Sequence, residues 1–247
     1  MRIFFLIVLL SFSSVLHAIS SHLFVGGNYT YLHFKSKGTH SFHGNLGGTQ
    51  ASYKYMKENS IYEAIKFTFC QGDLNNSTSK RKIRDFDNQG HIGYTLKGFN
   101  FLLTSFTGFG WRHIQHNLKQ TGEPSIKFFY NEIYIPVGIY ADFFITPIFS
   151  IGISGMWMPQ VFSLVNIKPI GNTHWKLEKR IGNVMIELPM TFSFTQKKIL
   201  WKLQLNPFFQ YWQDGSSIAK TTRDIALDLP RNIYKLLSIE VNLGCSF

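Results

Sequence analysis

Beyond its first 18 residues, the sequence lacks a long hydrophobic run. No later stretch approaches the roughly 20 consecutive apolar residues that a membrane-spanning helix needs, and the mean hydropathy is only −0.02. This absence excludes a bundle of transmembrane helices. If the chain enters a membrane, it does so with another kind of element.

The first 18 residues have the layout of a secretory signal peptide. Arg2 provides a positive start, Ile3 to Leu10 form an apolar run, and Ala18 closes a plausible small-residue cleavage site. The run is too short for a membrane anchor of ~20 residues. We therefore expect residues 1–18 to be removed and residues 19–247 to form one exported domain.

Cysteine and acidic residues are also scarce. The chain has 2 Cys, which permit at most one disulfide, and 14 Asp and Glu against 25 Lys and Arg. The formal net charge of +11 favours an anionic neighbour. For an exported chain, lipid headgroups or lipopolysaccharide are the expected neighbours, and nucleic acid is not an expected partner.

Aromatic residues, by contrast, are abundant, with 24 Phe and 11 Tyr. They are interleaved with polar residues, as in a transmembrane β-barrel, whose outer face is apolar and whose interior is polar. The clearest example is 201–211, where the apolar face comprises Trp201, Leu203, Leu205, Phe209 and Tyr211. A half-buried strand of a soluble sandwich would alternate in the same way.

Aromatic residues at both ends of an apolar strand are typical of interfacial girdles. Trp201 and Tyr211 have the spacing of the ~9–11 residues of a tilted membrane-spanning strand. We assign both residues, together with Trp157, to such a girdle.

Comparable alternation predicts an all-β fold, an antiparallel transmembrane β-barrel of about ten strands, or eight if two weak N-terminal runs are loops. Pro136, Pro189 and Pro207 fall inside candidate strands, where proline usually marks a bulge or an edge. The ten runs lie at about 22–35, 42–55, 61–69, 89–97, 99–112, 132–140, 149–157, 183–195, 201–211 and 233–247.

The connections between these runs fall into two alternating classes. Tight turns are expected at 56–60, 97–99, 145–147 and 196–198. Long polar loops are expected at 71–88, 113–125, 161–179 and 212–231, with only 36–40 short among the outer connections. Short periplasmic turns opposite long extracellular loops are the layout of outer-membrane barrels.

The C-terminal stretch VNLGCSF resembles the assembly signal of Gram-negative outer-membrane β-barrel proteins, which end on an aromatic residue preceded by alternating apolar positions. The resemblance is to the OmpA-like and opacity-type small barrels as a class. It implies location in the outer membrane and recognition of Leu243, Cys245 and Phe247 by the barrel assembly machinery. Cys245 stands where a bulkier apolar residue is usual.

Five charged residues are predicted to face the barrel interior: Lys66, Glu132, Glu187, Lys202 and Glu240. Buried charges must be paired or hydrated, so the interior is either a paired polar core or a narrow pore. Barrels near eight strands are filled by their own side chains, which favours the filled interior.

A basic run lies in the expected loop 71–88 and comprises Lys80, Arg81, Lys82 and Arg84. Such a run is often merely solvated. On a cell surface coated with anionic glycolipid it is a candidate contact for lipopolysaccharide.

The sequence gives little support for catalysis or metal binding, and we predict no cofactor. Three histidines lie in expected outer loops: His113, His116 and His174. Acidic residues lie there too, but none forms a recognisable paired-carboxylate or nucleophile–base motif. His113 and His116 lack a third metal ligand at a suitable spacing.

The two cysteines are predicted to stay unbridged, because Cys70 falls near the outer end of its strand and Cys245 near the opposite end. The favoured function is a non-enzymatic surface barrel, structural or adhesin-like, that acts through its long extracellular loops. A minor porin is the alternative, and a rim-site protease or lipid-modifying enzyme is a third hypothesis.

Overall fold

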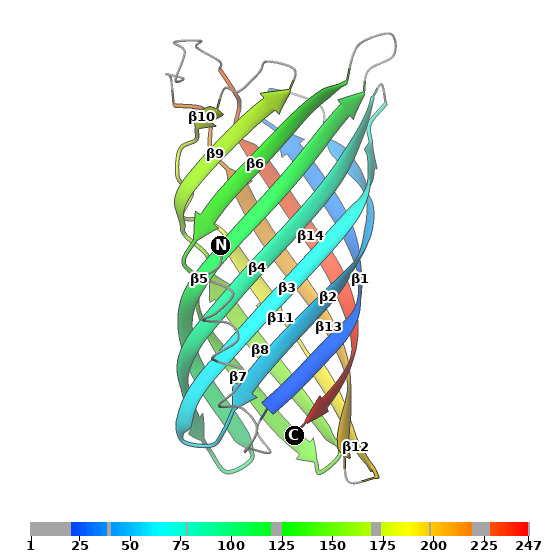
Figure 1. Cartoon of the computed structure of the whole chain (residues 1–247), viewed down its shortest axis with the longest axis vertical. Helices are drawn as coiled ribbons and strands as arrows, with labels where there is room; N and C mark the ends of the chain where they lie inside the picture. Colours follow the sequence, from blue (N-terminus) through cyan, green and yellow to red (C-terminus); the bar gives the residue numbers. More distant parts are fainter. Residues whose placement is uncertain are drawn as a thin grey trace, which may run out of the picture.

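The computed structural model describes residues 21–38, 41–77, 79–119, 125–168, 174–197, 199–218 and 228–246. The chain forms a closed antiparallel β-barrel of ten strands (Figure 1). Seven strands are single segments: β1 (Ser21–Ser36), β2 (Phe42–Met56), β3 (Ser60–Asn75), β4 (Lys80–Lys97), β5 (Phe101–Lys119), β13 (Ile199–Asp214) and β14 (Asn232–Ser246). The prediction of ten strands, and not eight, is confirmed.

The other three strands are each interrupted at a proline, because proline has no N–H to donate to the ladder. Pro136, Pro159 and Pro189 lie in the three breaks, whereas Pro207 stays inside β13 opposite Ile239. The pieces are β6 (Ile126–Tyr134) and β7 (Val137–Thr146), β8 (Phe149–Trp157) and β9 (Gln160–Lys168), and β11 (Val184–Glu187) and β12 (Met190–Gln196). A short additional strand, β10 (His174–Lys176), pairs with β9.

Hydrogen bonds bridge these breaks, so the barrel wall remains continuous. The carbonyl of Pro159 accepts a bond from Ile135 N at 3.1 Å, and that of Pro189 accepts one from Gly152 N at 2.6 Å. Pro159 and Pro189 thus lack a backbone donor, but their carbonyl groups still accept hydrogen bonds from the neighbouring strand.

The barrel closes where the first strand meets the last. β1 and β14 pair in register from His22↔Ser246 to Ser36↔Asn232. All four tight turns lie where expected, at the same end of the barrel as the two described chain ends, and we call this the turn end. The opposite end is the loop end. In outer-membrane barrels these ends face the periplasm and the exterior, respectively.

The strands run further toward the loop end than the sequence suggested, so the predicted long loops were wrong over most of 71–88 and over the strand parts of 113–125 and 161–179. The predicted loop at 212–231 overlaps a strand only as far as Asp214. β3 continues to Asn75 and β4 begins at Lys80, which leaves only residues 76–79 as the connection. β5, β9 and β13 likewise extend into the ranges expected to be loops. Residues 120–124, 169–173 and 219–227 lie outside the described residues.

The physical reason is that the alternation reverses its phase near the loop end. On β1, Tyr29 and Tyr31 are 54% and 44% exposed, whereas Leu32 and Phe34 are 2% and 0% exposed. Toward the turn end the outward face is apolar, as lipid requires, and toward the loop end the inward face is apolar, as water requires. The strand itself does not slip, because odd-numbered residues face outward from Leu23 to Lys35; only the face that carries the apolar residues changes.

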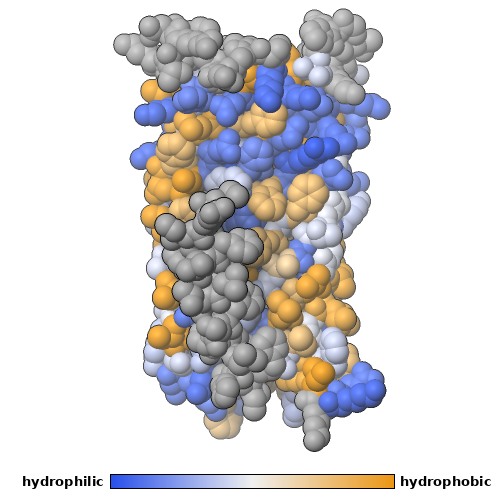
Figure 2. Space-filling view, viewed as in Figure 1, coloured by the Kyte–Doolittle hydropathy of each residue, from blue (hydrophilic) through white to orange (hydrophobic). Residues whose placement is uncertain are grey.

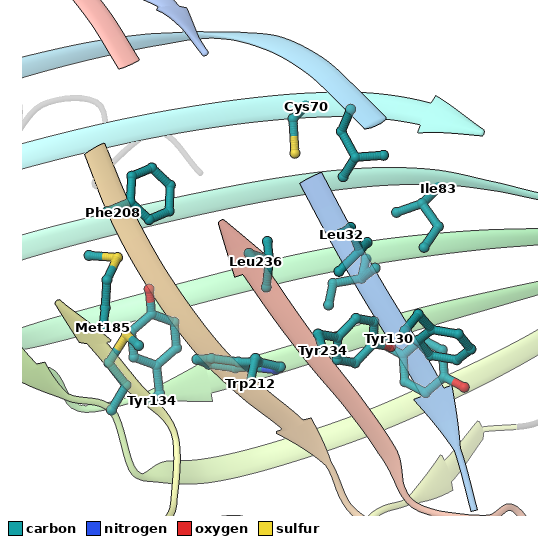
Figure 3. Close-up of a cluster of buried hydrophobic side chains, with 14 of the residues drawn as sticks. Leu32, Cys70, Ile83, Tyr130, Tyr134, Met185, Phe208, Trp212, Tyr234 and Leu236 are labelled. Atoms are coloured by element: carbon teal, nitrogen blue, oxygen red, sulfur yellow. The ribbon is translucent and has the colours of Figure 1, made fainter. Parts of the chain in front are cut away.

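The inward apolar residues form a packed core inside the loop-end half of the barrel. Figure 3 shows these side chains pointing into the barrel from several strands. They include Leu32, Ile83, Tyr130, Trp212, Tyr234 and Leu236, all of them buried. The loop-end half of the barrel is therefore filled by its own side chains.

The outer surface divides in the same way. Exposed apolar side chains occupy most of the wall, for example Val25, Ile139, Leu237 and Leu243. Hydrophilic side chains gather toward the loop end on the face shown in Figure 2. So large an exposed apolar surface matches a lipid-facing band. No helix among the described residues is long and apolar enough to cross a membrane.

Candidate functional site

The strongest candidate site is a cationic hollow on the outside of the barrel near the loop end. Alternate residues of a strand share a face, so Lys80, Lys82 and Arg84 of β4 all point outward. With Lys127 of β6 they form what we call the outer basic patch. The hollow has a volume of about 440 Å³, and its lining is completed by Asp73, Gln115 and Asn117.

Strand register explains how four strands build this patch. Lys82 lies between Asp73 of β3 and Asn117 of β5, and Asn117 in turn faces Lys127 of β6. The extended pairing of β4 with β3 and β5 fixes these positions, because a strand paired on both sides has little freedom to slip.

The cations of the patch are not neutralised by neighbouring carboxylates. Among the described residues, no Asp or Glu oxygen lies within 4.0 Å of a charged nitrogen of Lys80, Lys82, Arg84 or Lys127. Among the residues that the structure describes, Asp73 is the one acidic residue that lines the hollow. The patch therefore has a local excess of positive charge, available to an external anion.

Aromatic side chains lie beside the patch, toward the turn end. Phe86 and Trp111 contact each other edge to face with ring centroids 5.8 Å apart. Lys168 of β9 lies opposite Lys127, and its Nζ is 5.4 Å from the Phe129 ring centroid. Aromatic residues next to basic residues are the usual composition of a membrane–water interface.

Arg81 does not belong to this patch, which corrects the sequence-based grouping of Lys80, Arg81, Lys82 and Arg84. Its guanidinium Cζ lies inside the barrel, 4.6 Å and 4.9 Å from the ring centroids of Phe34 and Phe42. Its Nη1 is 2.9 Å from Nδ1 of His116. The correction follows from the strand: adjacent residues of a strand point to opposite faces.

Lys127 was missed by the sequence reasoning, which began this strand at residue 132. The alternation of Lys127, Phe129 and Asn131 with Phe128 and Tyr130 could have revealed it. That pattern has a polar outward face, so a search for apolar outward faces does not find it.

The side chains of the five charged residues predicted to face inward all lie in the interior of the barrel. Lys66 Nζ is 3.3 Å from Glu187 Oε1 and 3.0 Å from Glu240 Oε1, and Asn206 donates a 2.9 Å bond to Glu240. Lys202 lines a cavity near the turn end. The pairing of Lys66 with Glu187 and Glu240 meets the requirement that buried charge be compensated.

Glu132 lies nearer the loop end, where it is fully buried. Its carboxylate accepts hydrogen bonds from Trp212 Nε1 at 2.7 Å, Gln160 Nε2 at 2.7 Å and Ser163 Oγ at 3.0 Å. Arg112 lies over the Trp212 ring at 4.7 Å and donates to both oxygens of Asp85, with Nε at 3.0 Å from Oδ1. These groups fill the barrel across its width.

The girdle residues lie at opposite ends of the apolar band. Trp157 and Tyr211 both pair with Val184 at the start of β11, one from each side. Trp201 lies near the turn end, opposite Cys245. Their role at a lipid interface stays a prediction.

Leu243 and Cys245 of the predicted assembly signal belong to β14, where they pair with Val25 and Leu23 of β1. Phe247 lies outside the described residues. Cys70 and Cys245 are both free thiols, as predicted.

The three histidines considered for catalysis do not come together. His113 Nδ1 is 2.8 Å from Asn131 Oδ1, His116 is fully buried with Nε2 3.1 Å from Tyr234 Oη, and His174 is exposed on β10. Within the described ranges, no group of three or more His, Cys, Asp or Glu residues could hold a metal ion.

No family model matches the chain, and no curated protein matches its sequence. Solved structures do resemble it. The outer membrane protease OmpT from Escherichia coli is 10% identical, with 92% of this chain and 96% of that chain covered and a TM-score of 0.58. The transport unit of the autotransporter AIDA-I from Escherichia coli is also 10% identical, with 94% and 91% covered and a TM-score of 0.50. At this identity the likeness shows the fold alone: the chain is an antiparallel barrel of the outer-membrane type.

Proposed function

We propose that the protein is a non-conducting, non-enzymatic outer-membrane barrel that binds the phosphate groups of lipopolysaccharide at its outer basic patch. Export by residues 1–18 and insertion by the barrel assembly machinery are parts of the same proposal. The observation that carries it is the group of four cations without carboxylate partners, beside the aromatic residues of the apolar band.

The chemistry of the patch fits a glycolipid headgroup. A lipid held against the barrel wall places its acyl chains on the apolar band and its phosphates at the level of Lys82 and Arg84. A cation near an anionic membrane surface contributes about 1 kcal/mol of binding free energy. The binding surface is thus the strand wall, in place of the long loops expected from the sequence.

The filled interior supports the non-conducting part of the proposal. Apolar side chains, the Arg112–Asp85 pair and the Lys66 ion pairs occupy successive levels inside the barrel. Porins with water-filled channels have 16–18 strands, whereas narrow barrels are filled by side chains.

The test compares two matched double variants. Lys82→Gln with Arg84→Gln removes two charges from the patch, and Lys35→Gln with Lys235→Gln removes two exposed charges from β1 and β14. Binding of purified lipopolysaccharide to the folded protein is measured at low and moderate salt. We expect the patch variant to lose about tenfold or more in affinity, consistent with about 1 kcal/mol per cation, and the control to lose much less. Equal losses, or none in the patch variant, would contradict the proposal.

A further inference from the structure

A cavity of about 220 Å³ lies inside the barrel at the turn end, and we call it the vestibule. Its lining includes Met56, Thr146 and Pro147, which lie in or beside two of the short turns. At about 30 Å³ per water in the liquid, the vestibule has room for several waters or a small solute.

The vestibule is lined by more positive than negative groups. Lys54 of β2 and Lys202 of β13 both line it, together with His22, and Asp142 is its one acidic residue among those described. No carboxylate oxygen of the described residues lies within 4.0 Å of Nζ of either lysine. The next lysine inward, Lys66, has two such partners.

The contacts that these lysines do make are weak substitutes for an anion. Lys54 Nζ lies 4.4 Å from the centroid of the Tyr140 ring. Lys202 Nζ lies 3.3 Å from Nδ1 of His22, and that nitrogen is also 2.7 Å from Ser246 Oγ. Removing an ammonium from water without a charged partner is unfavourable, so the pair of lysines favours an oxyanion between them.

Inward from the vestibule the space inside the barrel narrows. Beyond it lie smaller cavities of about 80 Å³ and 40 Å³, the first of which shares Lys54, Tyr140 and Gln204 with the vestibule. Lys66 with its carboxylate partners and the Arg112–Asp85 pair follow toward the loop end. The packed apolar core of the loop-end half lies across the path of a solute that enters from the turn end.

We propose that the vestibule is a dead-end binding site for a small oxyanion, a carboxylate or a phosphate, which enters from the periplasmic side and is held by Lys54 and Lys202. The site is separate from the outer basic patch, and the barrel wall and core lie between the two. Such a site retains its ligand without transporting it.

The experiment is calorimetric titration of the full chain, folded in zwitterionic detergent, with sodium phosphate in one arm and sodium acetate in the other. We expect saturable one-site binding of at least one anion, and the stronger arm identifies the ligand class. Lys54→Gln and Lys202→Gln should each weaken binding at least tenfold, because each removes a charge-assisted hydrogen bond. The matched control is Lys57→Gln, which changes an exposed lysine of a turn at the same end and should leave affinity unchanged.

A variant that is expected to strengthen anion binding controls for misfolding, because a misfolded protein would not bind more tightly. Asp142→Asn removes the one carboxylate of the vestibule, so it should tighten anion binding severalfold. Absence of saturable binding in both arms would overturn the proposal. So would equal weakening by Lys57→Gln, or unchanged affinity in both lysine variants with normal heat-modifiable migration in gels.

Discussion

Arg81 and Lys82 are neighbours in the chain, but their side chains lie on opposite sides of the barrel wall. Arg81 lies against the rings of Phe34 and Phe42 inside the barrel, whereas Lys82 lines the cationic hollow on its outer surface. Two adjacent basic residues therefore have different physical roles, and substituting each in turn should affect different properties of the protein.

We expect Arg81→Gln to lower the free energy of unfolding by about 1–3 kcal/mol, because the cation–π contacts are lost and a buried partner is left unsatisfied. Lys82→Gln should change stability by less than about 0.5 kcal/mol, as is usual for surface substitutions. The measurement is urea unfolding in lipid or detergent. Lipopolysaccharide binding should show the reverse order, and the same order in both assays would contradict the assignment of faces.

Gly110 should not tolerate a side chain. A Cβ at this position would lie 2.1 Å from the Tyr134 ring, and Tyr134 is fully buried while it donates a 2.6 Å hydrogen bond to Asp87. Overpacking of this kind costs typically about 1–3 kcal/mol, so Gly110→Ala should lower the temperature at which heat-modifiable migration is lost. The matched control is Gly47→Ala, whose Cβ meets nothing within 4 Å.

Asp85 should be among the most sensitive positions of the interior. Asp85→Ala leaves the buried Arg112 without its carboxylate, and breaking a buried pair in this way costs about 3–5 kcal/mol. Denaturant unfolding measures the loss. Glu58→Gln breaks the exposed Lys97–Glu58 pair, which is 2.7 Å long, and should cost less than about 1 kcal/mol. Similar losses in both variants would show that the Arg112 pair is not sealed from water.

The packed interior predicts that the barrel does not conduct. Purified protein added to a planar bilayer should give no stable single-channel steps in moderate salt. Regular steps that scale with salt concentration would favour the porin alternative.

The Cys70 thiol should react only once the barrel wall is opened. Cys70 is 5% exposed and faces inward, whereas Cys245 faces outward on β14. Labelling of the denatured, unreduced protein should therefore find two thiols per chain. In the folded protein, Cys70 should stay protected from a water-soluble reagent.

Much of the fold could be predicted from the sequence, because lipid imposes a simple rule on a strand. Where Trp201, Leu203 and Leu205 must face acyl chains, the apolar residues reveal both the strand and its outward face. The same rule found the closing strand, whose odd-numbered residues from Leu237 to Cys245 face outward.

The rule does not hold at the loop end, where the outer surface of the barrel is no longer apolar. There Ile83 and Leu74 turn inward while Lys82 and Asp73 turn outward, so the alternation persists with its faces exchanged. The sequence predicts a loop here, because the outward residues are polar. The alternation of polar and apolar residues continues, but its apolar positions belong to the inward face.

The pairing of interior charges could not be predicted either. Lys66 and Glu240 are 174 residues apart in the chain, and they meet because closure of the barrel leaves only β1 and β2 between β3 and β14. Which inward charges share a level depends on the stagger of all the strands, and a single sequence does not reveal that stagger.

The pairing of β1 with β14 has a consequence for the order of events in folding. His22 and Ser246 are 224 residues apart, yet they hydrogen-bond across the closing seam. Contacts between such distant positions form slowly, and until they form, the growing sheet has two unpaired edges that a bilayer does not accept. We therefore expect the barrel to insert only after its last strand is available, with the pairing of β1 and β14 as the last step.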